Sequence, residues 1–181
     1  MPKNTGVAHA PVAVENGAFV DRLPEIYLHP GQQYVATSPA LLKMILGSCA
    51  GVFLFDPQNA VGGATHFMLP NHGSGPASPR YGDIAVSDLL GRFRALGSDR
   101  KNLVAKVFGG GSMLSALRNM PGNQIGHIGQ RNVDIAIEML AEAAIRITEK
   151  DVLGKLGRMV SMVSSTGEIN VEYLGQADGS R

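Results

Sequence analysis

The longest uncharged and mainly apolar run of this 181-residue chain covers residues 44–55, and a turn signal follows it directly. The run is shorter than the roughly 20 residues that a membrane-spanning helix needs, so a buried strand explains it better. The next four residues, Asp56-Pro57-Gln58-Asn59, are typical of a turn, and residues 61–69 are again mainly apolar. The sequence therefore predicts a β-hairpin over residues 50–69 in the core of the protein.

Elsewhere the pattern mixes further strands with helices. Apolar residues recur at helical spacing over 84–96, where Asp83 is placed to cap the helix, and over 132–144. Further elements are expected as strands at 33–37, 103–108 and 145–148, a short helix at 112–119 and a second hairpin over 157–174. Adjacent strand pairs among helices favour mixed sheets with helices packed outside over regular β-α-β winding.

Length, charge and the N-terminus limit the classes of protein to consider. The length fits one domain, and we expect residues 1–20 to be a flexible arm before a single domain over 21–181. Lys plus Arg number 16 against 15 Asp plus Glu, and Trp is absent, so nucleic-acid binding is not expected. The N-terminus has no apolar signal-peptide core, which predicts a cytoplasmic protein without membrane insertion.

The chain has one cysteine and five histidines, which limits the metal chemistry open to it. A lone cysteine rules out an internal disulfide and Cys-cluster zinc or iron–sulfur sites. No two histidines have the i, i+4 or His-x-His spacing of a metal site, so no bound metal is expected.

Cys49 and His66 are the candidates for chemistry. Cys49 reads either as a small core residue or as a nucleophile beside the Gly47-Ser48 break, where backbone N–H groups are free to stabilise an oxyanion. A hairpin centred between Asp56 and Asn59 places His66 directly opposite Cys49, close enough to accept a thiol proton. The alternative for His66 is an imidazole hydrogen-bonded to a carbonyl in the core.

Three polar or glycine-rich segments are more simply explained by turns and helix caps than by a role in binding or catalysis. The run Gly109-Gly110-Gly111-Ser112 lacks the lysine of a phosphate-binding P-loop and is expected to form a tight strand-to-helix turn. The polar segments 80–83 and 129–132 stand at presumed helix starts, where caps and surface salt bridges are expected.

These segments, in this order, resemble the CheD family of chemoreceptor glutamine deamidases, and the resemblance covers roughly residues 34–174. A Gly-Ser-Cys is followed seventeen residues after the cysteine by His-Phe-Met-Leu-Pro, which is a specific signature. The matching stretches are LGSCAGVFLFDP at 46–57, GGATHFMLP at 62–70, RYGDIAV at 80–86, KVFGGGSML at 106–114 and IGQRNV at 128–133.

The resemblance implies an α/β fold of the α+β type, a sandwich of mixed β-sheets flanked by helices. It also implies a cytoplasmic protein-glutamine glutaminase of chemotaxis, which hydrolyses receptor glutamine amides to glutamate. Cys49 is then the nucleophile that forms a thioester, and His66 is the base and acid whose imidazolium favours the thiolate. No metal or organic cofactor is needed. Some family members also hydrolyse receptor methyl esters, and many bind the phosphatase CheC.

The chain departs from the family at one point. Family members generally carry a catalytic threonine five or six residues before the cysteine, and here Lys43 and Met44 occupy those positions. We expect reduced activity, with Thr65 or Ser48 substituting in part. The alternatives are a weakly active or inactive adaptor that binds receptors and CheC, and a general thiol hydrolase of small amides.

Overall fold

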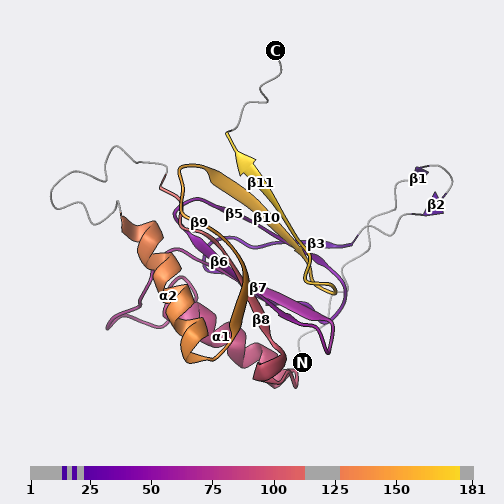
Figure 1. Ribbon diagram of the computed structural model, residues 1–181, viewed down its shortest axis with the longest axis horizontal. Coiled ribbons are helices and arrows are strands. Elements are labelled where there is room, and N and C mark those ends of the chain that lie inside the picture. Colours follow the sequence, from indigo (N-terminus) through magenta and orange to yellow (C-terminus); the bar gives the residue numbers. More distant parts are fainter. Residues whose placement is uncertain (1–13, 16–17, 20–22, 113–126, 176–181) are drawn as a thin grey trace, which may run out of the picture.

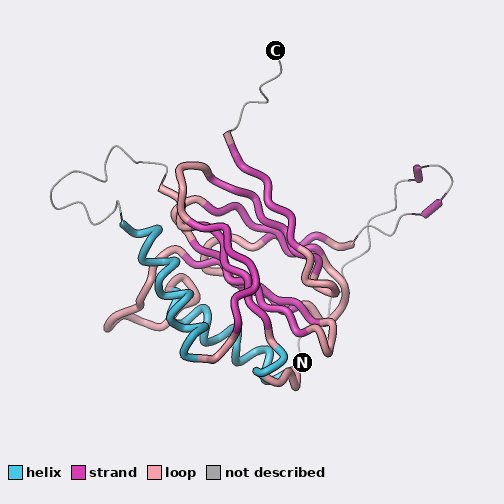
Figure 2. Tube along the Cα trace, viewed as in Figure 1, coloured by secondary structure: helices cyan, strands magenta, loops and turns pink. Residues whose placement is uncertain are grey.

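The computed structural model describes residues 14–15, 18–19, 23–112 and 127–175, and its elements stack in three layers (Figures 1 and 2). The elements are β1 (Val14–Glu15), β2 (Ala18–Phe19), β3 (Glu25–Tyr27), β4 (Gln33–Val35), β5 (Leu41–Leu46), β6 (Ala50–Asp56), β7 (Val61–Phe67), α1 (Gly82–Ala95), the 3-10 helix η1 (Arg100–Asn102), β8 (Val104–Gly109), α2 (Ile128–Glu142), β9 (Arg146–Val152), β10 (Gly157–Val163) and β11 (Ile169–Leu174). A five-stranded sheet lies between α1 and α2 on one side and a four-stranded sheet on the other.

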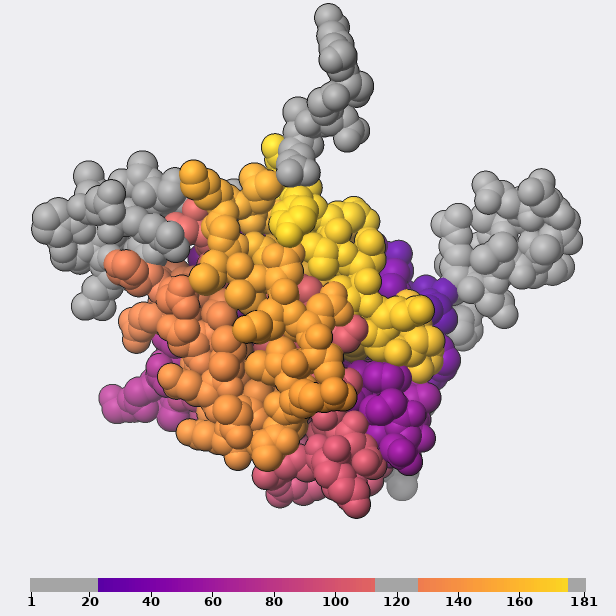
Figure 3. All heavy atoms as spheres, viewed as in Figure 1, coloured from indigo at the N-terminus to yellow at the C-terminus, as the bar shows by residue number. Residues whose placement is uncertain are grey.

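Both large sheets are mixed, which confirms the expected fold class. The five-stranded sheet has the order β4-β7-β6-β8-β9, and only its β8–β9 pair is parallel. The four-stranded sheet has the order β11-β10-β5-β3, and only its β3–β5 pair is parallel. In the space-filling view, residues of α2 and of β9 to β11, coloured orange to yellow, cover much of the face turned to the viewer (Figure 3).

The central strand β6 is buried on both of its faces. Val52 and Leu54 belong to the core between the five-stranded sheet and the helices, whereas Phe53 belongs to the core between the two sheets. All three side chains are inaccessible to solvent. A strand covered on both sides needs apolar residues at every position, which explains the continuous apolar run in the sequence.

The predicted hairpin is confirmed, but its predicted register is wrong by two residues. In the structure Asp56 pairs with Val61, and Gly51, not Cys49, pairs with His66. The turn between the strands comprises residues 57–60, one residue further along than expected, because Ala60 adopts a positive φ of 52°. Asp56 fixes this turn by accepting hydrogen bonds from the backbone N–H groups of Gln58 and Asn59.

The two helices begin earlier than the apolar pattern predicts. Helix α2 starts at Ile128 instead of residue 132, because its first turn contains Gly129 and polar residues that add no apolar periodicity. Helix α1 starts at Gly82, so Asp83 lies in the first turn and is not the cap. Its carboxylate instead accepts from His72, with Nδ1 and Oδ2 separated by 2.8 Å.

Two expectations concern residues that the structure describes only in part. Most of the short helix expected at 112–119 lies outside the described residues. Of the N-terminal arm, residues 1–20, only β1 and β2 are described, and they pair antiparallel. The single domain over 21–181 stays a prediction.

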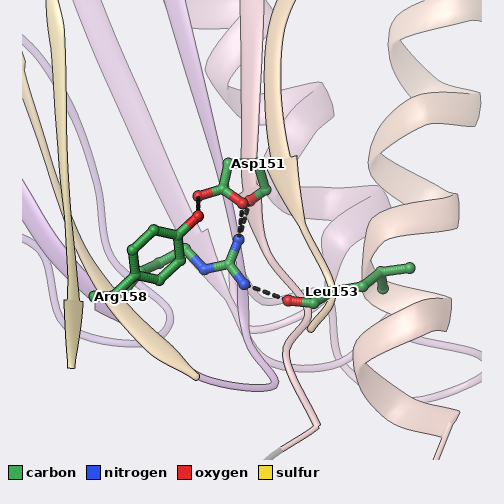
Figure 4. A network of polar contacts seen from close by, with 4 residues as sticks. Asp151, Leu153 and Arg158 are labelled. Carbon is green, nitrogen blue, oxygen red and sulfur yellow. Dashed lines mark hydrogen bonds and ion pairs between the residues drawn. The ribbon is translucent and has the colours of Figure 1, made fainter. Parts of the chain in front are cut away.

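A buried arginine joins the two sheets at one end of the sandwich (Figure 4). Arg158 of β10 is 2% exposed, and its Nη1 lies 2.6 Å from Oδ1 of Asp151 in β9. Its guanidinium also donates to the carbonyls of Asp151 and Leu153. Tyr173 of β11 completes the network through a 2.7 Å hydrogen bond to the second oxygen of Asp151. Strands of both sheets therefore depend on one guanidinium.

Arg158→Ala is expected to lower the free energy of unfolding by about 3 kcal/mol, because it leaves the Leu153 carbonyl without its donor and the Asp151 carboxylate without its charged partner. Urea denaturation followed by circular dichroism measures the loss. Lys101→Ala is the matched control, since its ion pair with Asp99 is exposed, and no measurable change in stability is expected. Equal effects of the two substitutions would contradict a sheet-joining role for Arg158.

Candidate active site

The bend at residues 47–49 is where the chain passes from the four-stranded sheet into the five-stranded sheet. It connects the end of β5 to the start of β6, and Cys49 is its last residue. The thiol is half-buried and packs against the core between the sheets. Cys49 therefore packs against the core, in line with its interpretation as a small core residue. It lies at the edge of that core, where part of its side chain is accessible to solvent.

The glycine run after β8 holds this bend from one side. The N–H of Gly110 donates to the carbonyl of Cys49 at 2.8 Å, and the N–H of Gly111 donates to the carbonyl of Gly47 at 2.7 Å. Gly109 has a φ of +100°, and a Cβ at this position would lie 2.3 Å from the Cys49 carbonyl oxygen. Only glycine fits so close to the backbone of Cys49. The run is thus a support for the bend at Cys49.

The backbone N–H groups of Ser48 and Cys49 take no part in these hydrogen bonds. No hydrogen bond that joins two described residues uses either group. Free N–H groups beside a nucleophile are the donors that an oxyanion hole requires. The bend can therefore stabilise negative charge that develops next to the Cys49 sulfur.

His66 is buried in β7, and its tautomer is fixed by the backbone. The ring is 2% exposed, and its Nδ1 lies 3.0 Å from the carbonyl oxygen of Leu28. A carbonyl only accepts, so Nδ1 carries the proton and Nε2 carries the lone pair. Nε2 is buried and has no hydrogen-bond partner. The hydrogen bond to a core carbonyl, considered above as an alternative to catalysis, is what leaves Nε2 free to accept a proton.

Cys49 and His66 occupy diagonal positions on one face of the β6–β7 pair. His66 is opposite Gly51, two residues from Cys49, and both side chains are on the side of the four-stranded sheet. Diagonal neighbours on a sheet are within reach of long or aromatic side chains, although they are further apart than an opposed pair. The register predicted from the sequence thus placed both side chains on the correct face of the sheet, but it was wrong to place them directly opposite each other.

Burial keeps both groups neutral. It raises the pKa of the Cys49 thiol above its ordinary value, against a smaller lowering by the residue's own backbone N–H. It lowers the pKa of the His66 imidazole, and the hydrogen bond to Leu28 opposes this shift only in part. Both directions favour a neutral thiol and a neutral imidazole over the expected thiolate–imidazolium pair.

The two residues at the family's threonine positions point in opposite directions. Met44 is fully buried, and its sulfur lies 2.6 Å from the place where a Cβ of Gly51 would be. Lys43 points to the outer face, where its Nζ lies 3.1 Å from a carboxylate oxygen of Glu25. Neither contacts the Nδ1 of His66, whose partner is the Leu28 carbonyl.

The expected substitution by a neighbouring hydroxyl is wrong for Thr65. Thr65 pairs with Val52 and therefore lies on the helix side of the sheet, whereas His66 lies on the other side. Ser48 is exposed on the bend, and its backbone carbonyl accepts a hydrogen bond from the side chain of Asn132. Sequence reasoning missed Leu28, because a main-chain carbonyl leaves no trace in a residue pattern.

Asn132 was expected at a helix cap or in a surface salt bridge, but it is buried beside the bend. Its side chain is fully inaccessible, and its Nδ2 lies 3.0 Å from the carbonyl oxygens of both Ser48 and Met68. The signal that pointed to it was its place in the segment 128–133, which matched the family. Spacing alone gave no hint of its contacts.

Metal and membrane binding can be checked in the part of the chain that the structure describes. There, no group of three or more His, Cys, Asp or Glu side chains is arranged to hold a metal ion. Neither of the two described α-helices is long and apolar enough to cross a bilayer.

Comparison with known proteins gives consistent matches. The family model described as CheD chemotactic sensory transduction matches residues 68–173. A probable chemoreceptor glutamine deamidase CheD of Sulfurimonas denitrificans is 35% identical over 84% of this chain and 96% of its own. The probable chemoreceptor glutamine deamidase CheD 1 of Anaeromyxobacter dehalogenans is 40% identical over 87% of this chain and 91% of its own.

A more distant likeness is found among solved structures. The Bacillus licheniformis hypothetical protein YfiH matches 68% of this chain and 51% of its own, with a TM-score of 0.45 and 18% identity, and is too remote to bear on function. The identity to the curated relatives, over most of both chains, is decisive. The chain belongs to the CheD family.

Proposed function

We propose that this protein is a chemoreceptor glutamine deamidase that converts receptor glutamines to glutamates in the cytoplasm during chemotactic adaptation. Its relatives carry that name. The observation that carries the proposal is the state of His66, whose Nδ1 is bound to the Leu28 carbonyl while its buried Nε2 has no partner among the described residues, on the face of the β6–β7 pair that also carries Cys49. This is the arrangement that a general base needs.

The reaction follows from these groups. The Cys49 sulfur attacks the side-chain carbonyl carbon of glutamine while its proton passes to Nε2 of His66. The N–H groups of Ser48 and Cys49 bind the oxyanion. The imidazolium returns the proton to the amide nitrogen, so that ammonia leaves and a thioester remains. Water, deprotonated by His66, then attacks the thioester, and glutamate and the free thiol are formed.

A neutral resting pair has a consequence for this mechanism. Because the thiol is protonated at rest, the thiolate forms only as attack begins, and the proton travels with the reaction. Hydrolysis of receptor methyl esters would use the same groups, with methanol as the leaving group in place of ammonia. Binding of a CheC-type phosphatase is a further proposal that rests on the family alone.

The main test is mass spectrometry of a receptor signalling domain after incubation with the protein. Cys49→Ala and His66→Ala are each expected to lower the rate of conversion of glutamine to glutamate by at least about 1000-fold, and the double variant no further, because the two act as a unit. The exposed His127 provides the control, and His127→Ala is expected to keep full activity.

Three outcomes would contradict this proposal. No conversion by the wild-type protein, with receptor binding intact, would instead support the adaptor. Substantial activity in the folded His66→Ala variant would show that another group is the base. Conversion of small free amides but not of receptors would support a general thiol hydrolase.

The pH dependence provides an independent prediction. Since burial lowers the pKa of His66, the base stays unprotonated to a lower pH, and the acid limb of kcat/KM is expected to have its midpoint below the ordinary value of 6.5. Alkylation by iodoacetamide reports only Cys49, because the chain has a single cysteine. The pH midpoint of the alkylation rate is expected above 9.0 in the folded protein, and at the ordinary pKa of a cysteine thiol after denaturation. A folded-state midpoint well below that of the denatured chain would instead indicate a thiolate–imidazolium pair.

Threonine at the family's positions is expected to bring no gain in rate, because the Leu28 carbonyl already orients His66. Met44→Thr is expected to destabilise the fold by about 2–4 kcal/mol, since it leaves a cavity and buries a hydroxyl. Lys43→Thr, on the outer face, is expected to change stability by less than about 1 kcal/mol. Deamidation rates and urea denaturation measure both effects, and a clear rise in kcat in either variant would contradict the assignment of Leu28.

A further inference from the structure

A single buried amide joins the strand segments that carry the two candidate catalytic residues. Nδ2 of Asn132 donates to the carbonyl of Ser48, directly before Cys49, and to the carbonyl of Met68, two residues after His66. Both distances are 3.0 Å. An amide nitrogen has two hydrogens, so both are used, and the group has no donor left for any other role.

This contact continues the β6–β7 pair beyond its last register position. The ladder ends at Ala50 and Phe67, so the next step would bring Cys49 opposite Met68. There the two backbone segments no longer hydrogen-bond to each other, and Asn132 donates one hydrogen bond to each of them instead. The bend at Cys49 is therefore outside the β6–β7 ladder and yet is held in place, by Asn132 on one side and by Gly110 and Gly111 on the other.

The contact also fixes the direction of the N–H of Cys49. The carbonyl of Ser48 and the N–H of Cys49 belong to one planar peptide unit, so a donor that holds the oxygen sets the orientation of the N–H. On the other side of the residue, the N–H of Gly110 holds the carbonyl of Cys49 at 2.8 Å. Both peptide units that flank the nucleophile are thus clamped.

Helix α2 is seated firmly enough to act as this clamp. A Cβ at Gly129 would lie 2.4 Å from the carbonyl oxygen of Gly110, and a Cβ at Gly110 would lie 2.4 Å from Cγ2 of Val133. The first turns of α2 and the glycine run are therefore in direct backbone contact, which places Asn132 at a set height above the bend.

The amide is retained at an energetic cost. Its Oδ1 is buried and has no hydrogen-bond partner among the described residues, and an unsatisfied buried acceptor lowers stability. The flipped amide would place Oδ1 against two carbonyl oxygens, so the network sets its orientation. The position needs two donors for the carbonyls of Ser48 and Met68, and the side-chain amide of Asn132 provides both from one nitrogen.

We propose that Asn132 is a positioning residue that aligns the Cys49 N–H toward the oxyanion of the reaction, an inference that rests on the proposed deamidase function. It touches no reacting atom. It acts through the peptide unit between Ser48 and Cys49, and its loss misaligns a donor whose contribution appears only in the transition state.

The test compares Asn132→Ala and the isosteric Asn132→Asp with the wild-type protein on the receptor signalling domain. Both variants are expected to lower kcat about 10- to 100-fold with KM unchanged, because the lost alignment affects only the transition state. Iodoacetamide alkylation of Cys49, which needs no oxyanion donor, is expected to change less than about threefold. Leu140→Ala, in the same helix but at its other end, is the control for destabilisation and is expected to keep kcat.

The outcomes separate this inference from the proposed function. A wild-type protein that does not deamidate removes the function and this inference with it. A wild-type protein that deamidates, beside folded Asn132 variants with unchanged kcat, overturns the positioning role alone. An equal loss of kcat in Leu140→Ala, or a parallel loss of alkylation in the Asn132 variants, would show a merely structural role. Circular dichroism confirms that each variant is folded, and either Asn132 variant suffices if the other does not fold.

Discussion

The burial of β6 on both faces is the constraint on which the rest of the structure depends. A strand covered by helices on one side and by a second sheet on the other leaves its neighbour along the chain, β5, to enter that second sheet. The chain must then cross from one sheet to the other within residues 47–49. Three residues with little side-chain bulk are suited to this crossing, and the last of them is Cys49. The candidate nucleophile is thus located where the fold needs an interruption of its hydrogen-bond ladders.

The same burial sets the chemistry of the pair. An imidazole enclosed between two sheets loses the solvation of its charged form, and the thiol at the edge of that core loses part of the solvation of its thiolate. Both effects favour the neutral forms, so the pair is poised for a proton transfer and not held as an ion pair. A single carbonyl, that of Leu28, decides which ring nitrogen is available. The proposed mechanism therefore depends on backbone groups as much as on side chains.

Much of the fold could be predicted from periodicity, and the main failures have physical causes. The hairpin, most of the strands and the apolar parts of both helices follow from apolar patterns that packing enforces. The register failed because it depends on Ala60, whose left-handed conformation is rare for a residue with a Cβ and has no sequence signal. Cys49 and His66 could be named as a pair, but Leu28 acts through a carbonyl that every residue has. Asn132 looked like a capping residue because its partners are far away in sequence.

The departure from the family's threonine can be understood from packing. On β5 alternate residues face opposite sides, so of positions 43 and 44 it is position 44 that points into the space between the sheets, and there Met44 fills the volume left by the missing side chain of Gly51. The two residues are complementary, because a side chain at 51 would displace the methionine and a smaller residue at 44 would open a cavity beside β6. The position directly opposite Gly51 is His66. Met44 belongs to the apolar core on this side of the sheet, burial lowers the pKa of the imidazole, and the carbonyl of Leu28 provides the acceptor that orients the ring. In place of the threonine hydroxyl expected from the family, this chain has the apolar side chain of Met44 in the core and the backbone carbonyl of Leu28 as the hydrogen-bond acceptor of His66.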